Sequence, residues 1–135
     1  FIGQPCCRQV ALTEALETKP NTYEAFERAL IKAYKFSQEN EDKTVDDVAA
    51  YIDIDKEFIR YEVYGGHGAS HPDPDKAPTV TLHDNVIEFG YTTDYDIEPL
   101  YNTAIYKAAL DTVVAENPGD PVYDSMLARF AENDQ

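Results

Sequence analysis

Hydrophobic residues recur at helical spacing toward both ends of the chain. Between residues 21 and 38, Tyr23, Phe26, Leu30 and Ala33 lie three or four positions apart, which predicts an amphipathic helix. The same spacing, with Pro, Asn and Asp at the ends, predicts further helices over residues 4–18, 44–51 and 97–116 and after Asp120-Pro121. Because apolar residues cover most sides of the 97–116 helix, we expect it to be buried.

The middle of the chain changes to a period of two. Ile59, Tyr61 and Val63 occupy alternate positions, and this alternation is typical of a strand. Strands are predicted at 57–64, 79–83 and 86–92, the last two joined by a tight turn at Asp84-Asn85. Between the first two strands, glycines and prolines predict a long loop over residues 65–78. The predicted fold is therefore α+β, with helices at both ends packed on a small three-stranded antiparallel sheet, in a single acidic globular domain spanning residues 1–135.

The charge of the chain indicates the class of partner that it binds. The chain has 26 Asp and Glu against 11 Lys and Arg, a formal net charge of −15, and no base lies between Lys76 and Lys107. A field of this sign repels nucleic acid and anionic membranes and attracts basic protein surfaces. On the 21–38 helix we expect Arg28, Lys32 and Lys35 to pair with Glu24 and Glu27, which leaves few bases to neutralise acids elsewhere.

Two triplets concentrate the acidic residues further. Each has three carboxylates at every second position: Asp53, Asp55 and Glu57, then Asp94, Asp96 and Glu98, with Tyr95 inside the second. In an extended backbone such carboxylates lie on one side, about 6.6–6.8 Å apart, and Glu41, Asp42, Asp46 and Asp47 could extend the first. We predict that these eleven residues bind the partner. The alternative is that acids preceding a helix act only as caps.

Histidines and cysteines offer other chemistry. All three histidines, His67, His71 and His83, fall in the predicted loop and hairpin, so they are the candidate ligands of a metal-dependent hydrolase. His67 and His71 are four positions apart, a spacing that places two ligands on the same side of a helix. The glycines and prolines of this segment disfavour a helix, so the spacing does not by itself predict a metal site. The adjacent Cys6 and Cys7 are too close for an unstrained disulfide. We expect them to be reduced and buried at the start of a helix.

In general character, a small, acidic, base-poor and tyrosine-rich protein resembles the nucleic-acid mimics and nuclease inhibitors of phages and bacteria, which include anti-restriction, anti-CRISPR and immunity proteins. The resemblance is one of character and carries over no residue. It implies a cytoplasmic binding protein, of the cell or of an infected host, that inhibits a nucleic-acid-handling enzyme by occupying its basic surface. No catalysis, cofactor or direct contact with nucleic acid or membrane is expected. The alternatives are the metal-dependent hydrolase and a salt-adapted structural protein.

Overall fold

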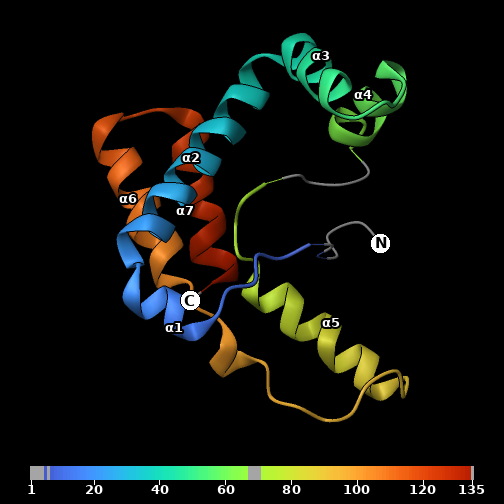
Figure 1. Cartoon of the computed structure of the whole chain (residues 1–135), viewed down its shortest axis with the longest axis vertical. Coiled ribbons are helices and arrows are strands. Elements are labelled where there is room, and N and C mark those ends of the chain that lie inside the picture. Colours follow the sequence, from blue (N-terminus) through green and yellow to red (C-terminus); the bar gives the residue numbers. More distant parts are fainter. Residues whose placement is uncertain (1–4, 6, 67–70, 135) are drawn as a thin grey trace.

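The computed structural model describes residue 5, residues 7–66 and residues 71–134, and in this part of the chain the protein is all-α. The helices, shown in Figure 1, are α1 (Thr13–Thr18), α2 (Pro20–Glu39), α3 (Glu41–Tyr51), α4 (Lys56–Tyr64), α5 (Lys76–Glu88), the 3-10 helix η1 (Glu98–Leu100), α6 (Ala104–Glu116) and α7 (Pro121–Asn133). The predicted α+β fold is wrong, because no strand occurs among the described residues.

A bundle of α2, α6 and α7 forms the core, with α1 packed against α2 (Figure 1). The rings of Tyr106 on α6 and Phe130 on α7 stack with their centroids 5.9 Å apart. The buried cluster consists of Ile31, Tyr106, Ala109, Leu110, Val113, Tyr123, Met126 and Phe130. The predictions of a helix near 21–38 and of a helix started by Asp120 are confirmed, and Asp120 caps α7 by accepting hydrogen bonds from two backbone N–H groups.

A hairpin of α3 and α4 extends from the end of α2 at the top of Figure 1. Residues 57–64, predicted as a strand, belong to helix α4. Alternation misled the prediction, because Ile59 and Val63 are also four residues apart and so share one helical face. The helix is fixed at its start by Asp55, whose carboxylate accepts hydrogen bonds from the backbone N–H groups of Glu57 and Phe58 at 2.9 and 3.2 Å. Ile59 is buried in the hairpin, as is Val45 of α3.

Helix α5 replaces the other two predicted strands. It runs without a break through Asp84-Asn85, where the sequence predicted a hairpin turn. The β-branched residues of this segment favour strands only weakly, and tertiary contacts override such preferences. Gly90, with φ +74°, ends the helix, and the backbone N–H of Tyr91 donates to the carbonyl of Val86 at 2.9 Å.

Other boundaries also differ from prediction. The helix predicted over 4–18 is reduced to α1, and Cys7 lies in non-helical chain and is exposed, contrary to the predicted buried pair; Cys6 lies outside the described residues. The predicted helix over 97–116 divides into η1 and α6. Among the described residues, every helix is too short or too polar to span a lipid bilayer.

Candidate functional site

The first acidic triplet lies between α3 and α4. Asp53 and Asp55 are in the irregular link, whereas Glu57 is in the first turn of α4, so the three carboxylates do not follow one extended backbone. Asp55 caps α4, which agrees with the alternative that acids preceding a helix act as caps. All three residues are nevertheless exposed. The first triplet therefore combines a local structural role for Asp55 with two outward carboxylates, those of Asp53 and Glu57.

The second triplet lies in residues 89–103, which connect α5 to α6 across the bottom of Figure 1. Asp94, Tyr95 and Asp96 occupy irregular chain, and Glu98 begins η1. The backbone N–H of Glu98 donates to the Asp96 carboxylate at 3.0 Å. All four side chains are exposed, so this triplet faces solvent next to Tyr95.

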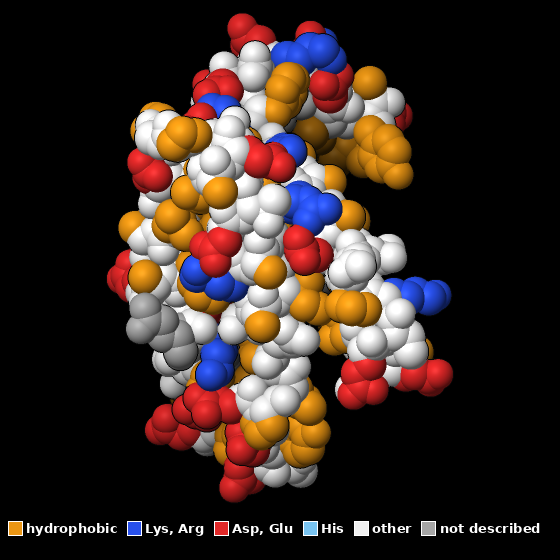
Figure 2. Space-filling view, turned by 90° about the vertical axis from the view of Figure 1, so that its left-hand side faces the viewer, with side chains coloured by type: hydrophobic (Ala, Val, Ile, Leu, Met, Phe, Trp, Pro, Cys, Tyr) orange, Lys and Arg blue, Asp and Glu red, His pale blue; other side chains and the backbone are white. Residues whose placement is uncertain are grey.

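The four acids predicted to extend the first triplet are paired instead. Lys56 Nζ lies 2.8 Å from an Asp46 oxygen and Lys43 pairs with Asp47. Arg60 pairs with both Glu41 and Asp42. The contacts of Lys56 and Arg60 join α4 to α3, whereas the Lys43 pair lies within α3. Acidic and basic side chains adjoin one another at the top of Figure 2, where the hairpin lies. Glu41, Asp42, Asp46 and Asp47 therefore carry much less uncompensated charge than the triplets.

Bases elsewhere are also used internally. The described residues include every Lys, Arg, Asp and Glu of the chain, and nine of the eleven bases form ion pairs with its own carboxylates. The predicted pairing of Arg28 with Glu24 is confirmed, but Lys32 pairs with Glu116 of α6 and Lys35 with both Glu39 and Asp120. The hydrogen bonds that Lys35 donates to the carboxylates of Asp120 and Glu39 raise the pKa of Lys35. None of these pairs involves either acidic triplet.

Exposed aromatic residues accompany both triplets. Tyr51 is 92% exposed just before the first, and Phe58 is exposed just after it. Tyr91, 84% exposed, and Phe89 precede the second. Large aromatic side chains are usually at least partly buried, so these exposed rings beside unpaired acids are an unusual feature of both regions.

A buried polar cluster that was not predicted from the sequence lies at the start of α5. We name it the Asp75 cluster, and it consists of Arg8, His71, Asp73, Asp75, Arg129 and Asp134. Asp75 is its centre, with a side chain only 8% exposed. Arg8 Nη2 lies 2.8 Å from its Oδ2, and Arg129 Nη2 lies 2.7 Å from its Oδ1. Asp75, at the start of α5, thus joins the N-terminal segment to α7. Arg8 lies 67 positions from Asp75 along the chain, and Arg129 lies 54 positions from it.

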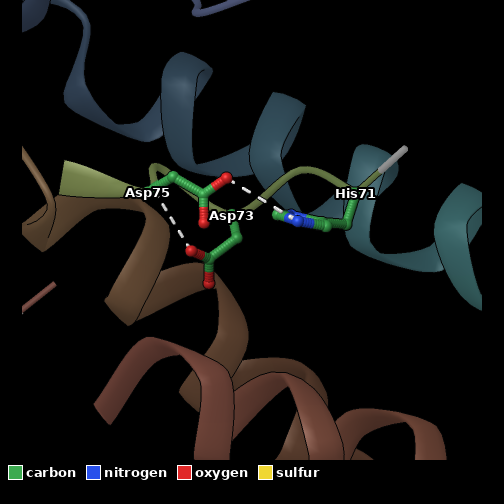
Figure 3. A group of neighbouring side chains, drawn as sticks. All are labelled: His71, Asp73 and Asp75. Atoms are coloured by element: carbon green, nitrogen blue, oxygen red, sulfur yellow. Dashed lines mark hydrogen bonds and ion pairs between the residues drawn. The ribbon is translucent and has the colours of Figure 1, made fainter. Parts of the chain in front are cut away.

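Figure 3 shows His71 and Asp73 beside Asp75. His71 Nε2 points toward Asp75 Oδ2 at 3.6 Å, and the backbone N–H of Asp75 donates to Asp73 Oδ1 at 3.1 Å. Burial, followed by the positive charge of Arg129, lowers the pKa of His71. The imidazole is therefore neutral at pH 7.

The carboxyl groups of Asp73 and Asp134 are also buried in this cluster. The side chain of Asp73 is 2% exposed, and Asp134 at the end of α7 is also buried. Burial, together with the hydrogen bond and the negative charge of Asp134, raises the pKa of Asp73 to about 8. Asp134 Oδ1 accepts a hydrogen bond from the backbone N–H of Lys76 at 2.8 Å, so it fastens the first residue of α5 to α7.

His71, Asp73 and Asp75 each offer a ligand atom, and these atoms lie within 4.8 Å of one another. Their surroundings favour ion pairing over metal binding, because both oxygens of Asp75 already contact guanidinium groups that would repel a cation. Of the other histidines proposed for a metal site, His83 is half-buried on α5 and His67 lies outside the described residues.

Comparisons with protein-family models, with curated proteins and with solved structures find no match for this chain.

Proposed function

We propose that this chain is a binding protein that inhibits a nucleic-acid-handling enzyme by occupying its basic surface. The observation that carries the proposal is the separation of charge: most bases pair internally, while the two triplets keep exposed carboxylates that no described Lys or Arg neutralises. An enzyme surface that holds phosphates presents the opposite charge and matches these carboxylates.

The mechanism is electrostatic and steric. Asp53, Glu57, Asp94 and Glu98 would pair with Arg and Lys side chains of the partner, forming charge-assisted hydrogen bonds in place of phosphate contacts. Long-range attraction would raise the association rate, and this effect weakens as salt screens the charges. The exposed rings of Tyr51, Phe58, Tyr91 and Tyr95 would add apolar contact, which salt does not screen.

Charge-neutralised triplets test the proposal. One variant carries Asp53→Asn, Asp55→Asn and Glu57→Gln, and a second carries Asp94→Asn, Asp96→Asn and Glu98→Gln. Asn at position 55 remains a good helix cap. The matched control neutralises three exposed acids far from both triplets along the chain, with Glu14→Gln, Asp124→Asn and Glu132→Gln. Every variant loses three negative charges, so an effect of net charge alone is the same in all.

Each tagged protein is incubated with cell lysate at low salt, and any captured enzyme is purified and mixed with labelled duplex DNA or RNA. We expect the wild type and the control to displace the nucleic acid, and each triplet variant to bind at least about tenfold more weakly. Raising the salt from 50 to 500 mM should weaken wild-type binding by a similar factor. A captured enzyme that binds nucleic acid equally well in the presence of the wild type would contradict inhibition. Equal binding by the triplet variants and the control would contradict the assigned surface.

A further inference from the structure

Helix α5 depends on polar contacts to stay in place. None of its thirteen residues is fully buried, and α7 is the helix with which it makes substantial contact. Its first residues are held by the Arg8 and Arg129 contacts to Asp75 and by the Lys76 backbone contact to Asp134. Asn133 Nδ2 also lies 3.4 Å from Asp75 Oδ1. The Asp75 cluster is therefore what fastens α5 to the end of the bundle.

The charges of the cluster do not balance if every acid is ionised. Three carboxyl groups, on Asp73, Asp75 and Asp134, meet two guanidinium groups, on Arg8 and Arg129. Asp75 takes the close contacts of both arginines, and Arg129 Nε lies 3.8 Å from Asp73 Oδ1. One negative charge would then remain in a buried site, which is costly unless a proton or cation neutralises it.

The unpartnered atoms show where a proton fits. Oδ2 of Asp73 and Oδ2 of Asp134 are both buried, and neither accepts a hydrogen bond from an N–H or hydroxyl donor of the described residues. The side chain of Asp134 lies close enough to Asp73 for its charge to raise the pKa of Asp73. Two neighbouring buried carboxylates repel when both are ionised, whereas one shared proton forms a hydrogen bond between them and removes the excess charge.

We propose that Asp73 and Asp134 share one proton and that this protonated pair is a pH-dependent latch, which holds α5 on α7 and releases it when the proton is lost. The charged and titratable groups next to the pair are His71 and Asp75 from the loop, Arg129 from α7 and Tyr106 from α6. Beyond them, Arg8 of the N-terminal segment pairs with Asp75, and Glu27 of α2 lies near Tyr106. Burial raises the pKa of Tyr106, so its hydroxyl keeps its proton. Burial also raises the pKa of Glu27 above its usual value.

The direction of the pH effect follows from proton binding. The folded pair has a higher pKa than an unfolded Asp, so the folded state binds more protons, and its stability falls as pH rises toward about 8. His71 acts in the opposite direction, because its pKa is lowered from 6.5 in the folded state and its protonation opposes folding at lower pH. The loosening of α5 is therefore expected between pH 6.5 and about 8.

Hydrogen exchange of the full chain tests the latch. After correction for the intrinsic exchange rate at each pH, protection of amides 79–88 in α5 should fall by up to about tenfold per pH unit between pH 6.5 and 8. Amides 104–116 in α6 should change less. Asp73→Asn supplies a permanent donor toward Asp134 without a titrating proton, so its α5 protection should be independent of pH over this range. Asp84→Asn, an exposed substitution on the same helix, is the matched control and should keep the wild-type profile.

Equal pH profiles for the wild type and Asp73→Asn would overturn the proposal, as would α5 protection that does not change with pH. If Asp73→Asn does not fold, Asp134→Asn provides the same test from the other partner. A cation in place of the proton is also distinguishable: if Ca²⁺ or Zn²⁺ added after EDTA treatment restored α5 protection at pH 8 in the wild type and not in Asp73→Asn, the proton latch would be wrong.

Discussion

Asp75 and Asp53 lie 22 positions apart in the chain and have opposite surroundings. Asp75 is buried between two guanidinium groups, and its neighbour Asp73 is buried against Asp134. Asp53 is exposed and has no ion pair with any described base, as is also true of Asp94 in the second triplet. The comparison separates the acids that hold the molecule together from those that are available to a partner.

Burial determines how much each carboxylate contributes to the stability of the fold. A buried carboxylate must be neutralised by a cation or a proton, so the loss of either lowers the free energy of unfolding substantially. An exposed carboxylate is hydrated and screened by salt, so its removal hardly affects folding. A net charge of −15 therefore describes two populations of acids with different roles.

Substitution of Asp75 should have the largest effect on stability. Asp75→Asn leaves two guanidinium groups without a counter-charge, and we expect the free energy of unfolding to fall by about 3 kcal/mol. Asp75→Ala should cost ~1 kcal/mol more, because residue 75 has φ +50° and Asn tolerates this left-handed conformation better than Ala. Urea unfolding followed by circular dichroism measures both. Losses below about 1 kcal/mol in both variants would show that Asp75 is not a structural centre.

A smaller effect is expected in the α3–α4 hairpin. Arg60→Gln removes the contacts of α4 to Glu41 and Asp42, which lie at the surface. Exposed pairs contribute little, so the melting temperature should fall by about 3 °C at most. The two freed carboxylates should also increase the attraction of the hairpin for a basic partner. A large loss of stability would show that the hairpin pairs belong with the buried acids.

The smallest effect on folding is expected for the triplet variants. Removal of three exposed charges should leave the melting temperature unchanged within about 2 °C, or raise it slightly, because self-repulsion decreases. Thermal melts at 20 and 500 mM salt measure this and also test the salt-adapted alternative. A salt-adapted protein would unfold at low salt, whereas the wild type should remain folded.

The sequence predicted the bundle helices but not the middle of the chain. Helix α2 is long and periodic, and Asp120-Pro121 is a strong start for α7, so local residues determine both. In α4 and α5, β-branched and aromatic residues at alternate positions fit a strand equally well, and the deciding contacts come from α3 and α7. The Asp75 cluster joins residues 8, 75 and 129. These residues are so far apart along the chain that no local sequence pattern could predict their contact. The exposed triplets could be predicted because their charge is visible in the sequence itself.

The most direct test of the division between buried and exposed acids is the titration of Asp73 by carboxyl carbon NMR in the full chain, with Asp73→Asn used to assign its resonance. We expect a pKa of about 8 for Asp73, because burial and the neighbouring Asp134 disfavour the charged form. A midpoint near 4, the ordinary value for an exposed aspartate, would contradict the shared proton and the separate role assigned to the buried acids.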